Sequence, residues 1–191
     1  MLRYNLNNII KILLFLVIIT SCSSIPVNKN MNKNNILSNI NAIDPLYKDL
    51  PVLLFVDIET QTLTHIEKGT VLKLYKISSS YYGTGSKLNS LKTPLGRHEI
   101  YKKIGSNLPI NAILKGRVWN GAIADVIKEP IDTEFDHVTS RILWLDGLEL
   151  GKNKGKGIDS RNRYIYIHGT AEEGLIGIPA SDGCIRMYNR D

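Results

Sequence analysis

Short runs of β-branched and aromatic residues, separated by polar or glycine-containing breaks, recur from Val52 toward the end of this chain. Such runs are typical of strands, and few segments show the 3.6-residue apolar period of a helix. The best short helical candidate is 102–114. The pattern predicts a mainly β fold, a curved, sandwich-like sheet with few short helices. The expected strands are 52–58, 61–66, 70–78, 97–101, 117–124, 141–145 and 163–167.

The last of these runs alternates in character up to a histidine. In a strand, Tyr164, Tyr166 and His168 share one face, while Ile165 and Ile167 share the other. The isoleucine face suits packing against a core. We therefore expect the face that carries the histidine to be the working face.

A cysteine follows this histidine within the run 181–187, SDGCIRM. A thiol attacks a carbonyl group as the thiolate, and a nearby imidazole is the usual means of forming one. Gly183 permits a tight turn beside Cys184, and the fixed charge of Arg186 favours the thiolate. Taken alone, Cys184 also suits a small buried core residue and His168 a buried core histidine. Together they predict a nucleophile and its base.

The N-terminus has the features of an export signal. Arg3 and Lys11 precede an apolar run at 12–19 that is too short to span a bilayer as a stable helix. The four residues that end at Cys22, ITSC, resemble a bacterial lipobox. This resemblance predicts a lipoprotein signal peptide over 1–21 and lipidation of Cys22.

Lipidation of Cys22 would leave Cys184 as a lone thiol in a compartment where thiols tend to be oxidised, which favours a functional role. Residues 22–46 are rich in Asn, Ser and Lys, and predict a flexible tether with an r.m.s. span of roughly 25 to 30 Å. The catalytic domain is then expected over 47–191. We expect an exported lipoprotein, anchored in the membrane and facing the periplasm.

The stretch from His168 to Met187 resembles the signature of the L,D-transpeptidases, the YkuD-type catalytic domain. In that family a histidine is followed by a Ser/Thr-x-Gly-Cys run. GTG at 83–85 and TPLG at 93–96 resemble conserved turns of the same family. RILWLDG at 141–147 resembles the strand that precedes the catalytic histidine in a Gram-negative branch.

The resemblance extends over 51–191 and implies the same β architecture. It also marks two departures. Asp182 occupies a position that is commonly histidine, and family members usually continue past the Cys-x-Arg segment with a helix and a closing strand. We therefore expect a Gram-negative, lipoprotein-like member that is C-terminally truncated and lacks the closing strand.

The resemblance implies the roles of the site residues. Cys184 is the expected nucleophile and His168 the proton donor and acceptor, with the carbonyl of Gly169 orienting the imidazole. The backbone N–H groups of Gly183 and Cys184 are the expected oxyanion donors.

Three further side chains are expected to contact the substrate: Arg186, Ser181 and Tyr166. For Arg186 two other roles stay open, which are organising the thiolate and pairing with Asp182.

The implied substrate is a tetrapeptide stem of peptidoglycan, from which D-alanine is released. The acyl group passes to an amine, giving a 3-3 crosslink or attachment to an outer-membrane lipoprotein. Two alternatives are a truncated, weak or inactive peptidoglycan-binding lipoprotein and an L,D-carboxypeptidase. No cofactor is expected.

The net charge of +6 does not indicate a nucleic-acid partner. Part of it lies in a glycine-interleaved basic loop without aromatic residues, which suits a solvated loop or a rim that attracts carboxylates. The histidines outside the signature show no metal-ligand spacing, so no metal site is predicted. The basic loop comprises Lys152, Lys154, Lys156, Arg161 and Arg163.

Overall fold

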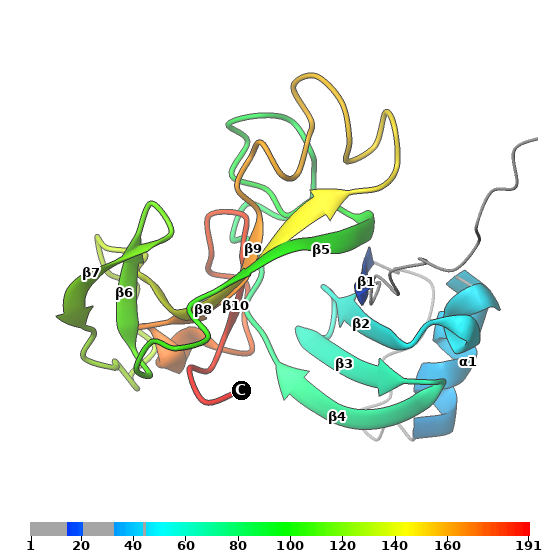
Figure 1. Ribbon diagram of the computed structural model, residues 1–191, viewed down its shortest axis with the longest axis horizontal. Helices are drawn as coiled ribbons and strands as arrows, with labels where there is room; N and C mark the ends of the chain where they lie inside the picture. Colours follow the sequence, from blue (N-terminus) through cyan, green and yellow to red (C-terminus); the bar gives the residue numbers. More distant parts are fainter. Residues whose placement is uncertain (1–14, 21–32, 44) are drawn as a thin grey trace, which may run out of the picture.

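The computed structural model describes residues 15–20, 33–43 and 45–191 (Figure 1). The regular structure of this part is mainly β, with one α-helix and two short 3-10 helices. The strands are β1 Phe15–Thr20, β2 Val52–Asp57, β3 Thr62–Glu67, β4 Thr70–Lys76, β5 Gly96–Ile104, β6 Ala112–Lys115, β7 Val118–Ile123, β8 Val138–Gly147, β9 Tyr166–Thr170 and β10 Ile185–Met187. The helices are α1 Lys33–Ile43, η1 Pro45–Asp49 and η2 Glu173–Leu175.

The main sheet runs in the order β10-β9-β8-β5-β1-β2-β3-β4, and β6 joins β8 to the outlying strand β7. Neighbours pair antiparallel except for β10 with β9 and β1 with β2. The sheet curls until its two ends meet, because Ser78, just beyond β4, exchanges two backbone hydrogen bonds with Arg186 in β10. The mainly β, curved fold predicted from the sequence is confirmed.

The curled sheet encloses an apolar core to which both of its ends contribute. Buried side chains from β1, β2 and β3 pack there against side chains from β8, β9 and β10. Ile165 and Ile167 point into this core. Tyr166 belongs to a different cluster on the other face and lies beside His168, at 6.5 Å between ring centroids. The predicted separation of a packing face from a working face is therefore present.

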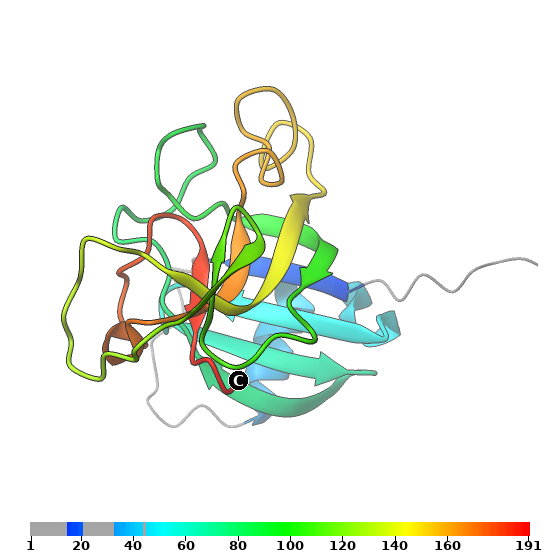
Figure 2. The ribbon, with the colours of Figure 1, turned by 60° about the vertical axis from the view of Figure 1, so that its left-hand side comes forward.

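The pairing of β9 with β10 places the two chemical residues near each other. Arg186 aligns with His168 and Ile185 with Ile167, so Cys184, one residue earlier, lies beside Tyr166. Figure 2 shows these two strands side by side, with the 81–95 and 148–163 loops rising from one end of the sheet.

The predicted helix at 102–114 is wrong. Its first three residues complete β5, and Ala112 begins β6. Gly105 between them has a φ of +94°, a left-handed conformation that ends the strand and that a helix cannot accommodate. The apolar residues of this stretch serve two strands rather than one helical face.

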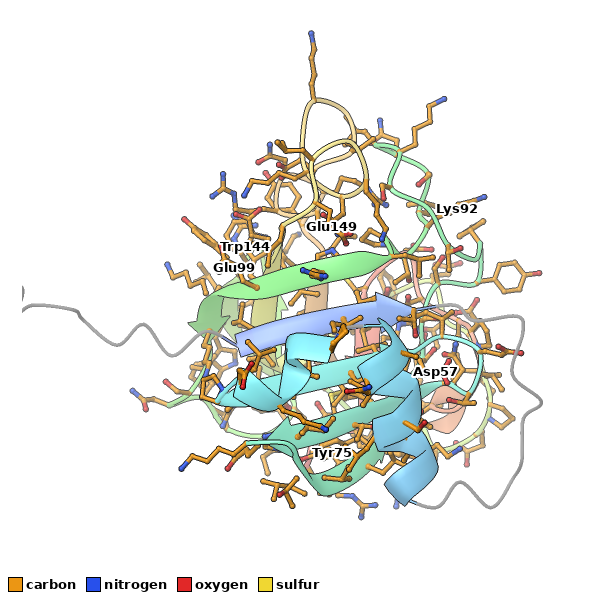
Figure 3. The ribbon with its side chains drawn as sticks, turned by 90° about the vertical axis from the view of Figure 1, so that its right-hand side faces the viewer. Asp57, Tyr75, Lys92, Glu99, Trp144 and Glu149 are labelled. Atoms are coloured by element: carbon orange, nitrogen blue, oxygen red, sulfur yellow. The ribbon has the colours of Figure 1, made fainter. Side chains whose placement is uncertain are left out.

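Part of the predicted tether is helical. α1 places Ile36 and Ile40, one helical turn apart, against Leu53 and Phe55 of β2. Figure 3 shows α1 lying across the outer face of β2, β3 and β4. A single turn-spaced isoleucine pair in an Asn-rich stretch is a weak helical signal, but the sheet gives it a surface to cover. Residues 45 and 46 begin η1, and the rest of the tether, including Cys22, lies outside the described residues.

The apolar run predicted to be the core of the signal peptide supplies β1. This strand lies between β2 and β5, and Val17, Ile18 and Ile19 are at most 2% exposed (Figure 3). Cleavage before Cys22 would remove β1 and leave the facing edges of β2 and β5 without a partner. The same segment is thus suited to export and to the sheet, but it cannot serve both in one molecule.

A chain beginning at residue 22 should therefore be less stable than the full chain. Three buried apolar side chains are lost, each contributing about 1.5–3 kcal/mol, so we expect the free energy of unfolding to fall by about 5–9 kcal/mol. Urea unfolding of residues 1–191 and 22–191, both with Cys22→Ser, measures the difference. Equal midpoints would show that β1 does not stabilise the domain.

Candidate active site

His168 is held in one tautomer. It lies in β9, 3% exposed, and its Nδ1 is 2.7 Å from the carbonyl oxygen of Gly169. Because a carbonyl only accepts, Nδ1 carries the proton and Nε2 keeps its lone pair. Burial lowers the pKa of His168 below its usual value, with a smaller opposing effect from Asp136. The imidazole is therefore a neutral base, and Gly169 has the orienting position expected of it.

The Cys184 thiol lies against β9. Its Sγ accepts a hydrogen bond from the N–H of Tyr166 at 3.3 Å and lies 3.5 Å from the carbonyl oxygen of Tyr164. Among the described residues no hydrogen bond joins this thiol to His168. Cys184 directly precedes β10, and by strand alternation its side chain lies on the face of the sheet that carries His168. Catalytic hydrogen bonds are often open in this way before substrate binds.

The thiol is protonated at rest. Burial raises the pKa of Cys184 to about 12, and the Tyr166 N–H together with the charges of Arg186 and Arg163 only partly offsets it. The site therefore does not hold a preformed thiolate–imidazolium pair. A nucleophilic role for Cys184 would therefore require transfer of its proton to a base.

The nucleophile turn is fixed by buried hydroxyl groups. Ser181 Oγ donates to the carbonyl of Cys184 at 2.6 Å and accepts from the N–H of Gly183 at 3.3 Å. Ser181 is completely buried, so its role is to shape the turn, and the predicted substrate contact is not supported. Since the Gly183 N–H is engaged, the N–H of Cys184, which has no acceptor in the described part of the chain, is the better placed oxyanion donor.

The GTG and TPLG turns support this cysteine from the other side. Thr93 Oγ1 donates to the carbonyl of Gly183 at 3.0 Å and accepts from the N–H of Ser80 at 3.0 Å. Thr93 in turn exchanges backbone hydrogen bonds with Gly83 and Gly85. Gly183 has a φ of +117°, and a Cβ there would approach the backbone of the same loop, so this position requires glycine. These distant motifs therefore act as one clamp on the nucleophile.

Arg186 is a buried cation that is paired with two carboxylates. It is 2% exposed, and its guanidinium binds Glu172 at 2.8 Å and Asp136 at 2.9 Å. Glu172 also accepts from the N–H and hydroxyl of Thr133. The predicted ion pair with Asp182 is wrong, whereas the predicted substrate contact stays a prediction. Arg186 instead ties the loop between β7 and β8 to the nucleophile strand.

Asp182 is exposed at the position where the family resemblance led us to expect histidine. Partial burial raises the pKa of this carboxyl, as does the neighbouring charge of Asp136, while Arg186 opposes them. The carboxyl groups of Asp182 and Asp136 therefore lie at the end of the site where Arg186 aligns with His168.

Arg163 is a site residue that was expected only to belong to a basic loop and to begin the strand 163–167. Its guanidinium donates to the carbonyls of Gly85 and Lys92, and its charge favours the Cys184 thiolate. The sequence signal that could have indicated its place in the site is its position just before β9, the strand that carries His168. Other members of the basic loop form ion pairs with carboxylates that precede it in the chain: Lys152 with Glu149, and Lys154 and Arg161 with Asp146 in β8.

A curled β-sheet with a cysteine and an oriented histidine on adjacent strands defines a candidate cysteine acyltransferase site. Compared with known protein families, residues 51–191 match YkuD, the L,D-transpeptidase catalytic domain. The chain therefore belongs to the L,D-transpeptidase catalytic domain family.

Solved structures similar to this chain carry the same name. An L,D-transpeptidase from Mycobacterium smegmatis is 17% identical, with a TM-score of 0.38, covering 72% of this chain and 49% of its own. An L,D-transpeptidase from Xylanimonas cellulosilytica DSM 15894 (residues 123–326) is 16% identical, with a TM-score of 0.29, covering 73% and 50%. The chain thus spans about half the length of each. No curated protein matches the chain.

Two features are absent from the described residues. No group of three or more His, Cys, Asp or Glu side chains within 15–20, 33–43 and 45–191 could hold a metal ion. In the same residues, no helix has the length and apolar character needed to cross a membrane.

The raised pKa of Cys184 predicts slow alkylation at neutral pH. The rate with iodoacetamide in the Cys22→Ser background should rise continuously with pH beyond pH 9, because the thiolate fraction grows tenfold per pH unit below a pKa of about 12. Alkylation in urea should instead level off near the ordinary thiol pKa of about 8.5. A plateau below pH 8 in the folded protein would contradict a thiol that is protonated at neutral pH.

Proposed function

We propose that this chain is a peptidoglycan L,D-transpeptidase that uses Cys184 as nucleophile. Membership of the family supports peptidoglycan chemistry of this class. The observation that carries the residue assignment is the hydrogen bond from His168 Nδ1 to Gly169, which leaves Nε2 as a base on the face that the thiol shares.

The reaction proceeds through a thioester. The sulfur of Cys184 attacks the carbonyl between the third stem residue, a diaminopimelate, and the terminal D-alanine, while His168 Nε2 takes the thiol proton. The N–H of Cys184 stabilises the oxyanion. The C–N bond then breaks, and His168 returns the proton to the departing amino group of D-alanine. An acceptor amine attacks the thioester, a new amide forms and the thiol is regenerated.

The acceptor decides the product. The side-chain amine of a second diaminopimelate gives a 3-3 crosslink, and a lysine of an outer-membrane lipoprotein gives an anchored protein. Water would give an L,D-carboxypeptidase. A peptidoglycan-binding lipoprotein without turnover is the second candidate, and the protonated thiol, which lies against the carbonyl of Tyr164, favours it.

Incubation with disaccharide-tetrapeptide muropeptides tests the proposal. We expect D-alanine release and an acyl adduct on Cys184 by mass spectrometry, with both lost in Cys184→Ala and in His168→Gln. Cys22→Ala is the matched cysteine control and should retain both signals. If the folded wild type behaves like Cys184→Ala yet binds the muropeptide, the non-catalytic candidate is correct.

We also propose that the protein is exported and anchored to a membrane by lipid on Cys22. The lipobox-like ITSC sequence after a basic and apolar N-terminus supports this location. Metabolic labelling with a fatty acid should mark the wild type and not Cys22→Ala. Label that persists on the variant would contradict the anchor.

A further inference from the structure

Arg117 occupies a strained position at the tip of the β6–β7 hairpin. The strands are joined by Gly116 and Arg117, with φ of +58° and +69°, a two-residue turn that needs left-handed backbone at both positions. Glycine adopts this conformation freely, whereas a long side chain there costs about 1 kcal/mol or more. Such a residue persists where its surroundings hold it in place.

Three aromatic residues hold the guanidinium of Arg117. Its central carbon lies 4.6 Å from the ring centroid of Trp144 and 5.0 Å from that of Tyr164. Nη1 donates to the hydroxyl of Tyr166 at 3.1 Å. Because the N–H of Tyr166 contacts the sulfur of Cys184, the length of one tyrosine side chain separates this cation from the nucleophile.

The cation has no acidic partner in the part of the chain that the structure describes. Arg161 and Arg186, by contrast, form ion pairs with carboxylates there. The Tyr166 hydroxyl accepts from Arg117 and has no acceptor for its own proton among the described residues. Burial raises the pKa of Tyr166, so this hydroxyl stays protonated. A partly exposed cation and an O–H donor are therefore both available to an anion.

Charge around the site is arranged in two parts. Arg117 contacts Tyr166, the first residue of β9. Asp136 pairs with Arg186, which aligns with His168 two residues further along that strand. The exposed carboxyl of Asp182 also senses Asp136. An anionic substrate group is attracted toward Arg117 and repelled from the acidic end.

Resting on the proposed function, we propose that Arg117 and Tyr166 form a subsite that binds a carboxylate of the donor stem peptide. The guanidinium offers a planar, forked set of donors, and the aromatic faces limit its movement. The carboxylate belongs either to the terminal D-alanine or to the side-chain end of diaminopimelate. Binding it fixes the direction in which the scissile carbonyl approaches Cys184.

Three synthetic donors and two variants test this subsite. The donors are the unmodified tetrapeptide, its terminal carboxamide and its form amidated at the diaminopimelate side-chain carboxyl. Arg117→Gln should raise KM for the unmodified donor 10- to 100-fold with little change in kcat, the size expected for a charge-assisted hydrogen bond. Arg117→Lys should recover only part of this loss. Arg161→Gln is the matched control and should change KM less than threefold.

The amidated donors identify the carboxylate. Amidation of the recognised group should cost the wild type the same 10- to 100-fold and cost Arg117→Gln nothing further, while amidation of the other group should affect both proteins equally. Equal losses in both proteins for both amidated donors would overturn the subsite, as would an Arg117→Gln effect no larger than that of Arg161→Gln.

Binding measured by calorimetry in the Cys184→Ala background separates this inference from the proposed function. If the wild type forms no thioester but Arg117→Gln still lowers donor affinity at least tenfold in that background, the transpeptidase proposal fails and the subsite stands. If thioester forms and Arg117→Gln leaves affinity and KM unchanged, the subsite fails and the transpeptidase proposal stands. A melting curve of each variant confirms that it is folded.

Discussion

The parallel pairing of β9 with β10 is the interaction on which the candidate site depends. It spans only three residue pairs, yet it sets Cys184 beside Tyr166 and aligns Arg186 with His168. A strand of three residues is too short to hold its place alone. Ser78 pairs with its other edge, and the ion pairs of Arg186 with Asp136 and Glu172 hold it from the face that carries His168. The chemistry is thus positioned by contacts with segments remote in sequence.

The fold could be predicted where the signal is local. The strands from β2 to β4 were expected nearly to the residue, because β-branched runs and glycine turns are short-range features. β10 was missed because only its partners β9 and Ser78 make it a strand. The error at 102–114 has the same origin: its apolar spacing suits a helix, but Gly105 and the edge of β8 direct it into two strands.

In the site too, residues within one continuous motif could be predicted from the sequence, whereas contacts between distant segments could not. His168, Gly169 and Cys184 lie in one continuous motif, so their geometry was accessible from the sequence. The partners of Arg186 were not, because Asp136 lies in a loop before β8 and Glu172 had no neighbouring signal. Arg117 was taken for the start of a strand, whereas its backbone conformation makes it part of a turn. Ion pairs and cation–π contacts between distant segments produce no periodic pattern in the sequence from which they could be predicted.

The position of β1 links the proposed location of the protein to the stability of its site. β1 is central, and its side chains reach the same core as Ile167 and Ile185, the residues that pair β9 with β10. A signal peptide that leaves with residues 1–21 therefore removes support from directly beneath the two catalytic strands. Export by cleavage and a site stabilised by β1 are alternatives for any one molecule, unless another strand fills the position between β2 and β5. Because the loss acts through the core, it should lower the stability of the β9–β10 pairing before it changes any group that contacts the substrate.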